Sequence, residues 1–266
     1  MIKRIATALV LAAALILALR SGNPWIFGGL LSVLLLAGAW EWSSLCGLKS
    51  LAARLAFLAG IAAIIVVSRR YFWADEAFCW LMLLALLWWL AAFVWVLLAP
   101  ARIGTAAAIV AGLLSLTPAW LALFRVAMEW PHRMRWTLLI LVIPVAMDTG
   151  GYFAGSAFGR TKLAPRVSPG KTWEGVFGGL ALVLLLAVVS QSLTGLPLSP
   201  WIALCLAAAA LSVVGDLTES LLKRASGVKD SGRLFPGHGG VLDRVDSILA
   251  AAPVMTLGLI WLGAGR

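Results

Sequence analysis

The run AFCWLMLLALLWWLAAFVWVLL, residues 77–98, contains no charged side chain. About 20 apolar residues in a helix cross the hydrocarbon core of a bilayer. A run of this length therefore predicts a transmembrane helix. Similar apolar runs recur along the chain, so that nine segments are candidate spans: residues 5–19, 25–42, 55–67, 77–98, 105–128, 137–158, 173–190, 200–222 and 245–262.

Composition places the whole chain in the same class. The 266 residues are 62% hydrophobic and 12% charged, whereas soluble domains have about 45–50% apolar and about 25% charged residues. The long Leu, Ala and Val runs exclude a β-barrel, which needs short segments of alternating polarity. The sequence therefore predicts an all-α, polytopic transmembrane helical bundle of about nine spans. The 14 tryptophans suit the interfacial belts of such a bundle, for example Trp25, Trp40, Trp42, Trp88 and Trp89.

Charge distribution predicts the orientation and the kind of partner. With nine spans, the loops on the side of the N-terminus hold about twice as many of the 21 Lys and Arg residues as the loops on the other side. By the positive-inside rule the N-terminus is then cytoplasmic. The net charge is +10. Because the basic residues lie in short loops between spans, we expect anionic lipid or phosphate as the partner, and no nucleic acid.

The acidic residues divide the chain into two parts. Seven of the 11 Asp and Glu residues follow position 145. We therefore expect residues 1–140 to be N-terminal transmembrane helices, and residues 141–266 to be catalytic transmembrane helices with cytoplasmic loops. Both parts belong to one integral membrane unit. The first 20 residues resemble a signal peptide, but we interpret them as a retained first span.

Asp216 stands in an apolar run directly before the polar stretch SLLKRASGVKDSGRLFPGHGGVLDRVD, residues 220–246. An acidic side chain at the centre of a span costs about 2.5–3.5 kcal/mol and indicates a functional site. Helical spacing places Ser220 and Lys223 on the same face as Asp216, with Glu219 beside them. The alternative is a helix end at the membrane interface with a local pair between Asp216 and Lys223.

Two acids and a glycine turn close this polar stretch. Asp243 and Asp246 share one face of the last span, and two close carboxylates repel unless a hard divalent cation lies near them. The alternative is capping of the helix N-terminus. In the turn PGHGG, residues 236–240, the backbone N–H groups of the glycines can approach phosphate oxygens closely. For His238 two roles remain open, phosphate binding or packing of the turn.

A second polar region, residues 148–175, begins inside another span. Asp148 is again an acid at an intramembrane position and indicates a site. Gly151, Gly155 and Gly159 recur every four residues, which predicts close packing against another helix.

Basic and hydroxyl residues follow on the expected cytoplasmic side, including Arg166, Ser168 and Lys171. The turn SPGKT, residues 168–172, suits a phosphate clamp before a helix N-terminus, although topology alone would also explain the basic residues. Together, the basic groups, the acids and the two turns fit a site for a nucleoside triphosphate and its metal at a bilayer. The residues thus favour phosphoryl or nucleotidyl transfer to a lipid.

The stretch 220–246 resembles the signature of the phosphatidate cytidylyltransferase, or CDP-diacylglycerol synthase, family. The pattern S-x-x-K-R-x4-K-D-x5-P-G-H-G-G-x-x-D-R-x-D is matched at every fixed position. The similarity extends closely over residues 145–250. It implies the reaction of CTP with phosphatidate to give CDP-diacylglycerol and pyrophosphate. It also implies Mg2+ dependence, with a second cation such as K+ at a two-metal site.

The resemblance assigns roles to the polar residues. The implied metal ligands are Asp216, Asp243 and Asp246. The implied catalytic residues are these three together with Lys223, Arg224, Lys229 and Arg244. The implied substrate- or phosphate-binding residues are Arg166, Ser168, Lys171, Ser220, Arg233, Gly237, His238, Gly239 and Gly240.

The resemblance further implies a bacterial-type plasma (inner) membrane, with the active site facing the cytoplasm and the lipid entering laterally. The sequence leaves a homodimer open. The alternative functions are another CTP-dependent lipid or polyprenol phosphotransferase and a transporter of phosphorylated anions.

Overall fold

The computed structural model describes residues 13–21, 23–99, 102–232 and 239–264. Eight helices in these ranges are long and apolar enough to cross a membrane. They are α2 (Pro24–Leu45), α3 (Leu51–Tyr71), α4 (Asp75–Leu98), α5 (Thr105–Glu129), α6 (Arg133–Phe158), α7 (Trp173–Thr194), α8 (Leu198–Ala225) and α9 (Leu242–Trp261). They confirm the predicted all-α membrane bundle and its last eight spans. Residues 13–20 are also helical, and the start of the predicted first span lies outside the described residues.

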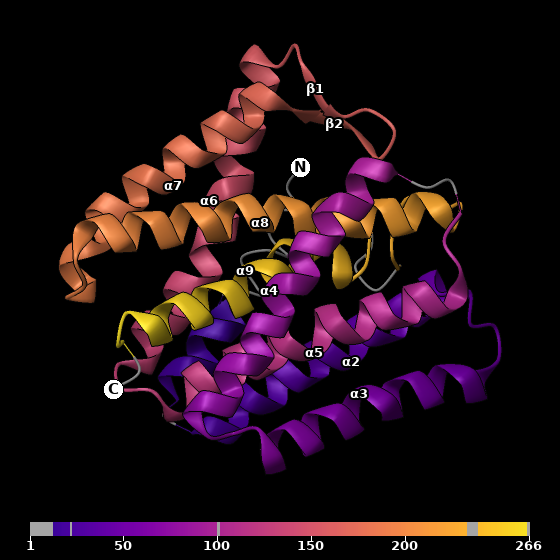
Figure 1. Cartoon of the computed structure of the whole chain (residues 1–266), viewed down its shortest axis with the longest axis horizontal. Coiled ribbons are helices and arrows are strands. Elements are labelled where there is room, and N and C mark those ends of the chain that lie inside the picture. Colours follow the sequence, from indigo (N-terminus) through magenta and orange to yellow (C-terminus); the bar gives the residue numbers. More distant parts are fainter. Residues whose placement is uncertain (1–12, 22, 100–101, 233–238, 265–266) are drawn as a thin grey trace.

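Between α6 and α7 the chain forms a short antiparallel ribbon, where the sequence had suggested only a turn. Strand β1 (Lys162–Ala164) pairs with β2 (Ser168–Thr172). Pro165 suits the second position of the connecting turn, which the bond from Val167 N to Ala164 O closes at 3.1 Å. Thr172 ends the ribbon and caps α7, because its hydroxyl accepts from Gly175 N at 3.2 Å. In Figure 1 the ribbon lies at the upper edge, with α3 at the opposite edge.

Helices α6 and α7 pack closely through small residues, as the glycine spacing predicted. A Cβ atom on Gly175 would lie 2.8 Å from the carbonyl oxygen of Gly151. Without side chains at these points the two backbones can approach each other. The contact holds the end of the ribbon against α6.

The tryptophans divide between the surface and the core. Trp25 and Trp40 are exposed, as expected of interfacial residues, but Trp42 and Trp89 are only 1% exposed. Trp42 donates its indole N–H to Ala108 O at 2.9 Å, which satisfies its one polar atom inside the bundle. Trp42 and Trp89 therefore face the core of the bundle and not lipid, a distinction that apolar composition alone does not make.

Candidate active site

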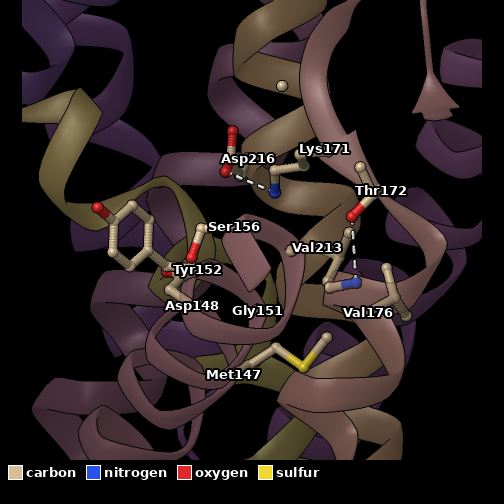
Figure 2. A pocket seen from close by; sticks show the side chains of 13 residues that line it. Met147, Asp148, Gly151, Tyr152, Ser156, Lys171, Thr172, Val176, Val213 and Asp216 are labelled. Carbon is tan, nitrogen blue, oxygen red and sulfur yellow. Dashed lines mark hydrogen bonds and ion pairs between the residues drawn. The ribbon is translucent and has the colours of Figure 1, made fainter. Parts of the chain in front are cut away.

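A cavity of about 390 Å3 lies between α6, β2, α7 and α8. Its charged lining residues are Asp148 from α6, Lys171 from β2 and Asp216 from α8. Figure 2 shows these side chains with Tyr152 and Thr172 around the same space. Charged side chains from three separate elements therefore line one cavity within the bundle.

Lys171 and Asp216 form an ion pair in this cavity, with Lys171 Nζ 2.6 Å from Asp216 Oδ2. Their side chains are 23% and 25% exposed. Ser220 donates its hydroxyl to Asp216 Oδ1 at 3.2 Å, as the helical spacing predicted. Burial alone would lower the pKa of Lys171, but the Asp216 carboxylate, together with the charges of Asp148 and Asp246, raises it above its usual value. The lysine therefore carries its positive charge at neutral pH.

Acids from three helices meet near this pair. Asp148 accepts a hydrogen bond from Ser247 Oγ of α9 at 2.9 Å. The charges of Asp148, Asp216 and Asp246 interact with one another and with Lys171. Close contact of α8 with α9 makes this possible, because a Cβ atom on Gly215 would lie 2.5 Å from the backbone oxygen of Asp246. These three acids thus form one electrostatic group with Lys171.

A second ionic group surrounds Lys223. Its Nζ atom lies 2.5 Å from Asp243 Oδ1 and 3.2 Å from Glu219 Oε1. Glu219 is only 1% exposed, so its ion pair with Lys223 is buried. The local pair between Asp216 and Lys223, considered from the sequence, does not form, because each side chain has a partner from another segment. Asp246 also interacts electrostatically with Glu219 and Lys223, which links the two ionic groups.

The other oxygen of Asp243 holds the two sides of the loop between α8 and α9. Asp243 Oδ2 accepts from Ser231 N at 3.0 Å, from Ser231 Oγ at 2.9 Å and from Gly240 N at 2.8 Å. Gly239 has φ +75°, and a Cβ atom there would lie 2.4 Å from the same oxygen. Glycine is required here by both its backbone conformation and the close carboxylate.

The acids offer hard oxygen ligands of the kind that Mg2+ prefers. Within the ranges that the structure describes, no group of three or more His, Cys, Asp or Glu side chains is close enough to hold a metal ion. Asp216 nevertheless fits a cation, because its Oδ2 already holds the ammonium of Lys171. Asp243 Oδ2 accepts three donors, whereas Oδ1 accepts from Lys223. A carboxylate oxygen has two acceptor positions, so Oδ1 is the atom of Asp243 with capacity for a cation.

The remaining predicted residues lie on the ribbon, at the end of α8 and at the start of α9. Arg166 is exposed at the turn of the ribbon, and Ser168 begins β2. Arg224 donates Nε to Val167 O at 3.4 Å, so the end of α8 contacts the ribbon. Lys229 is exposed in the loop after α8, and Arg244 is exposed in the first turn of α9. Three further predicted residues lie outside the described ranges: Arg233, Gly237 and His238.

The sequence analysis missed Glu41, which belongs to α2 in the part of the chain assigned no chemistry. Glu41 is 7% exposed and accepts hydrogen bonds from Val241 N at 3.0 Å and Leu242 N at 2.9 Å. The sequence did contain a signal for this residue, because Glu41 is an acid within an apolar run. The same feature indicated that Asp148 and Asp216 belong to a site.

Comparison with known proteins identifies the family of this chain. Residues 2–261 match the model of the cytidylyltransferase family. A phosphatidate cytidylyltransferase of Pseudomonas aeruginosa is 41% identical over 97% of this chain and 96% of its own. One from Haemophilus influenzae is 38% identical over 94% and 96%. A third, from Bacillus subtilis, is 48% identical over 43% of each chain. The chain is an integral membrane protein that belongs to the cytidylyltransferase family.

Proposed function

We propose that this protein transfers the cytidylyl group of CTP to phosphatidate and releases pyrophosphate, which makes it a CDP-diacylglycerol synthase of phospholipid biosynthesis. The observation that carries the proposal is its end-to-end similarity to two bacterial proteins named phosphatidate cytidylyltransferase. The names of these relatives favour cytidylyl transfer over the polyprenol-kinase and transporter alternatives.

The cavity between α6, β2, α7 and α8 suits this reaction chemically. A phosphate oxygen of phosphatidate attacks the α-phosphorus of CTP and forms a new P–O bond. The bond from the α-phosphorus to the bridging oxygen breaks, and its electron pair leaves with pyrophosphate. The nucleophile is already anionic, so the main requirement is to bring two polyanions together and to stabilise the leaving group. Lys171 and Lys223 supply positive charge for this purpose, and Lys171 lines the cavity itself.

We also propose Mg2+ as the cofactor, with a second cation such as K+, and Asp216, Asp243 and Asp246 as the ligands. Support comes from the oxygen donors of Asp216 and Asp243 Oδ1 and from the electrostatic interaction of Asp246 with Asp216. A bound divalent cation would neutralise charge on the phosphates during transfer. Lys171 must then exchange part of its contact with Asp216 for a contact with phosphate.

The active site is proposed to face the cytoplasm of a bacterial-type inner membrane. The asymmetry of Lys and Arg between the two sets of loops supports this orientation, as does the supply of CTP in the cytoplasm. The homodimer that the sequence left open stays a prediction.

The test uses the purified protein in vesicles that contain phosphatidate, with CTP labelled at either the α- or the γ-phosphate. Cytidylyl transfer places the α label in the lipid and the γ label in pyrophosphate. Transfer of the γ label to a lipid would instead identify a kinase. Chelation with EDTA should abolish the reaction and added Mg2+ should restore it, whereas full activity in EDTA would refute the metal proposal.

A further inference from the structure

Glu41 connects the N-terminal part of the bundle to the loop between α8 and α9. Its Oε1 accepts from Val241 N at 3.0 Å, and its Oε2 accepts from Leu242 N at 2.9 Å and lies 2.9 Å from Ser231 Oγ. A buried carboxylate is costly unless donors surround it. The two backbone N–H groups, 200 and 201 residues further along the chain, stabilise Glu41 where it is, and the Ser231 hydroxyl is a third donor that Glu41 shares with Asp243.

The carboxylate of Glu41 caps helix α9. The first N–H groups of a helix have no partners within the helix. The residue at the N-cap of α9 is Val241, whose side chain makes no capping hydrogen bond. Glu41 replaces the missing cap, and its negative charge also suits the positive end of the helix. The position of the first turn of α9, which carries Asp243, therefore depends on Glu41.

The same carboxylate lies between the two sides of the loop. A Cβ atom on Gly232 would lie 2.2 Å from Glu41 Oε1, and one on Gly240 would lie 2.1 Å from Glu41 Oε2. The backbone on both sides of residues 233–238 thus packs directly on Glu41. Neither position has room for a side chain while Glu41 is present.

Ser231 joins Glu41 to Asp243. Its hydroxyl lies 2.9 Å from Glu41 Oε2 and 2.9 Å from Asp243 Oδ2, so its single proton can serve either carboxylate. Asp243 in turn holds Lys223 through its other oxygen at 2.5 Å. We infer that Glu41 is a positioning residue for the reaction, which acts through Ser231 and the start of α9 to fix Asp243 and Lys223. This inference rests on the proposed cytidylyl transfer.

The main test is Glu41→Gln, measured as turnover per folded enzyme after gel filtration in detergent. Glutamine keeps the shape, but its NH2 group would face a backbone N–H that needs an acceptor. We expect kcat to fall about tenfold or more, while the KM values for CTP and phosphatidate change less than about threefold. The reason is that the substitution displaces Asp243 and Lys223, which act in the transition state, and leaves substrate binding largely intact. Glu41→Asp keeps the charge and should recover part of kcat. Glu76→Gln, the same change at an exposed position in the first turn of α4, should leave kcat unchanged.

Ser231→Ala provides a second test that leaves Glu41 and its backbone contacts in place. We expect kcat to fall severalfold, and Glu41→Gln with Ser231→Ala to be little worse than Glu41→Gln alone, because both changes interrupt one path to Asp243. If Glu41→Gln does not fold, wild-type kcat in Ser231→Ala overturns the inference. Folded Glu41→Gln with kcat within twofold of wild type also overturns it. A wild-type protein that forms no CDP-diacylglycerol would instead refute the proposed function.

Discussion

Replacing Lys171 with methionine should remove most of the activity while the bundle stays folded. The change keeps the apolar stem of the side chain and removes the ammonium that lies 2.6 Å from Asp216 Oδ2. A hydrogen bond to a charged group contributes about 1.5–3 kcal/mol to stability. Both side chains are about a quarter exposed, at 23% and 25%, so solvent screening places the stability loss near the lower end of that range.

The effect on turnover should be larger than the effect on stability. Loss of one group that stabilises developing charge costs about 2.7–4 kcal/mol in the transition state, which corresponds to a decrease of about 100- to 1,000-fold. Because the pKa of Lys171 is raised, the lysine is protonated from about pH 6 to 9 in the wild type.

The assay follows CDP-diacylglycerol formation in mixed micelles at saturating Mg2+. Lys171→Arg keeps the charge and should be less impaired than Lys171→Met. Lys162→Met removes the same charge from an exposed position on the adjacent strand and should have nearly wild-type activity. A kcat/KM for Lys171→Met within threefold of wild type would refute the role of this lysine at the phosphates.

Two further changes test the second ionic group and the helix contact. Asp243→Asn should lower turnover at least about 100-fold in a protein that still inserts into the membrane and elutes normally. The reason is that the amide of asparagine cannot accept from both Lys223 and the backbone donors. Near-normal turnover at saturating Mg2+ would remove Asp243 from the site. Gly175→Val should lower the free energy of unfolding by about 1–3 kcal/mol, since its Cβ atom would lie 2.8 Å from Gly151 O. Thermal unfolding checks this against Gly60→Val, where the added Cβ meets no atom of another segment within 4 Å. Equal melting temperatures of the two variants would contradict the packing argument.

The sequence by itself determined the class of fold and much of the site. In a bilayer each span must satisfy its own backbone hydrogen bonds, so an uncharged run such as residues 77–98 can only be a helix there. The bond from Ser220 to Asp216 was also predictable, because residues four apart meet on one face of any helix. The motif between Ser220 and Asp246 supported the family before any geometry was known.

The ribbon was beyond sequence reasoning because its strands have only three and five residues, too few to show a periodic pattern. Strand pairing also depends on a partner segment, here across the turn at Pro165. Only the tertiary structure showed that Thr172 ends one strand and caps the following helix.

Only the tertiary structure decided which charged groups become partners. Helical spacing placed Asp216 and Lys223 on one face, but Asp216 pairs with Lys171 and Lys223 pairs with Asp243. Periodicity states which face a side chain occupies and not which helix lies against that face. The capping of α9 by Glu41, which comes from the N-terminal part of the chain, was not predictable for the same reason. Such contacts form only when helices that are distant in sequence pack together, so the composition of either segment alone does not contain them.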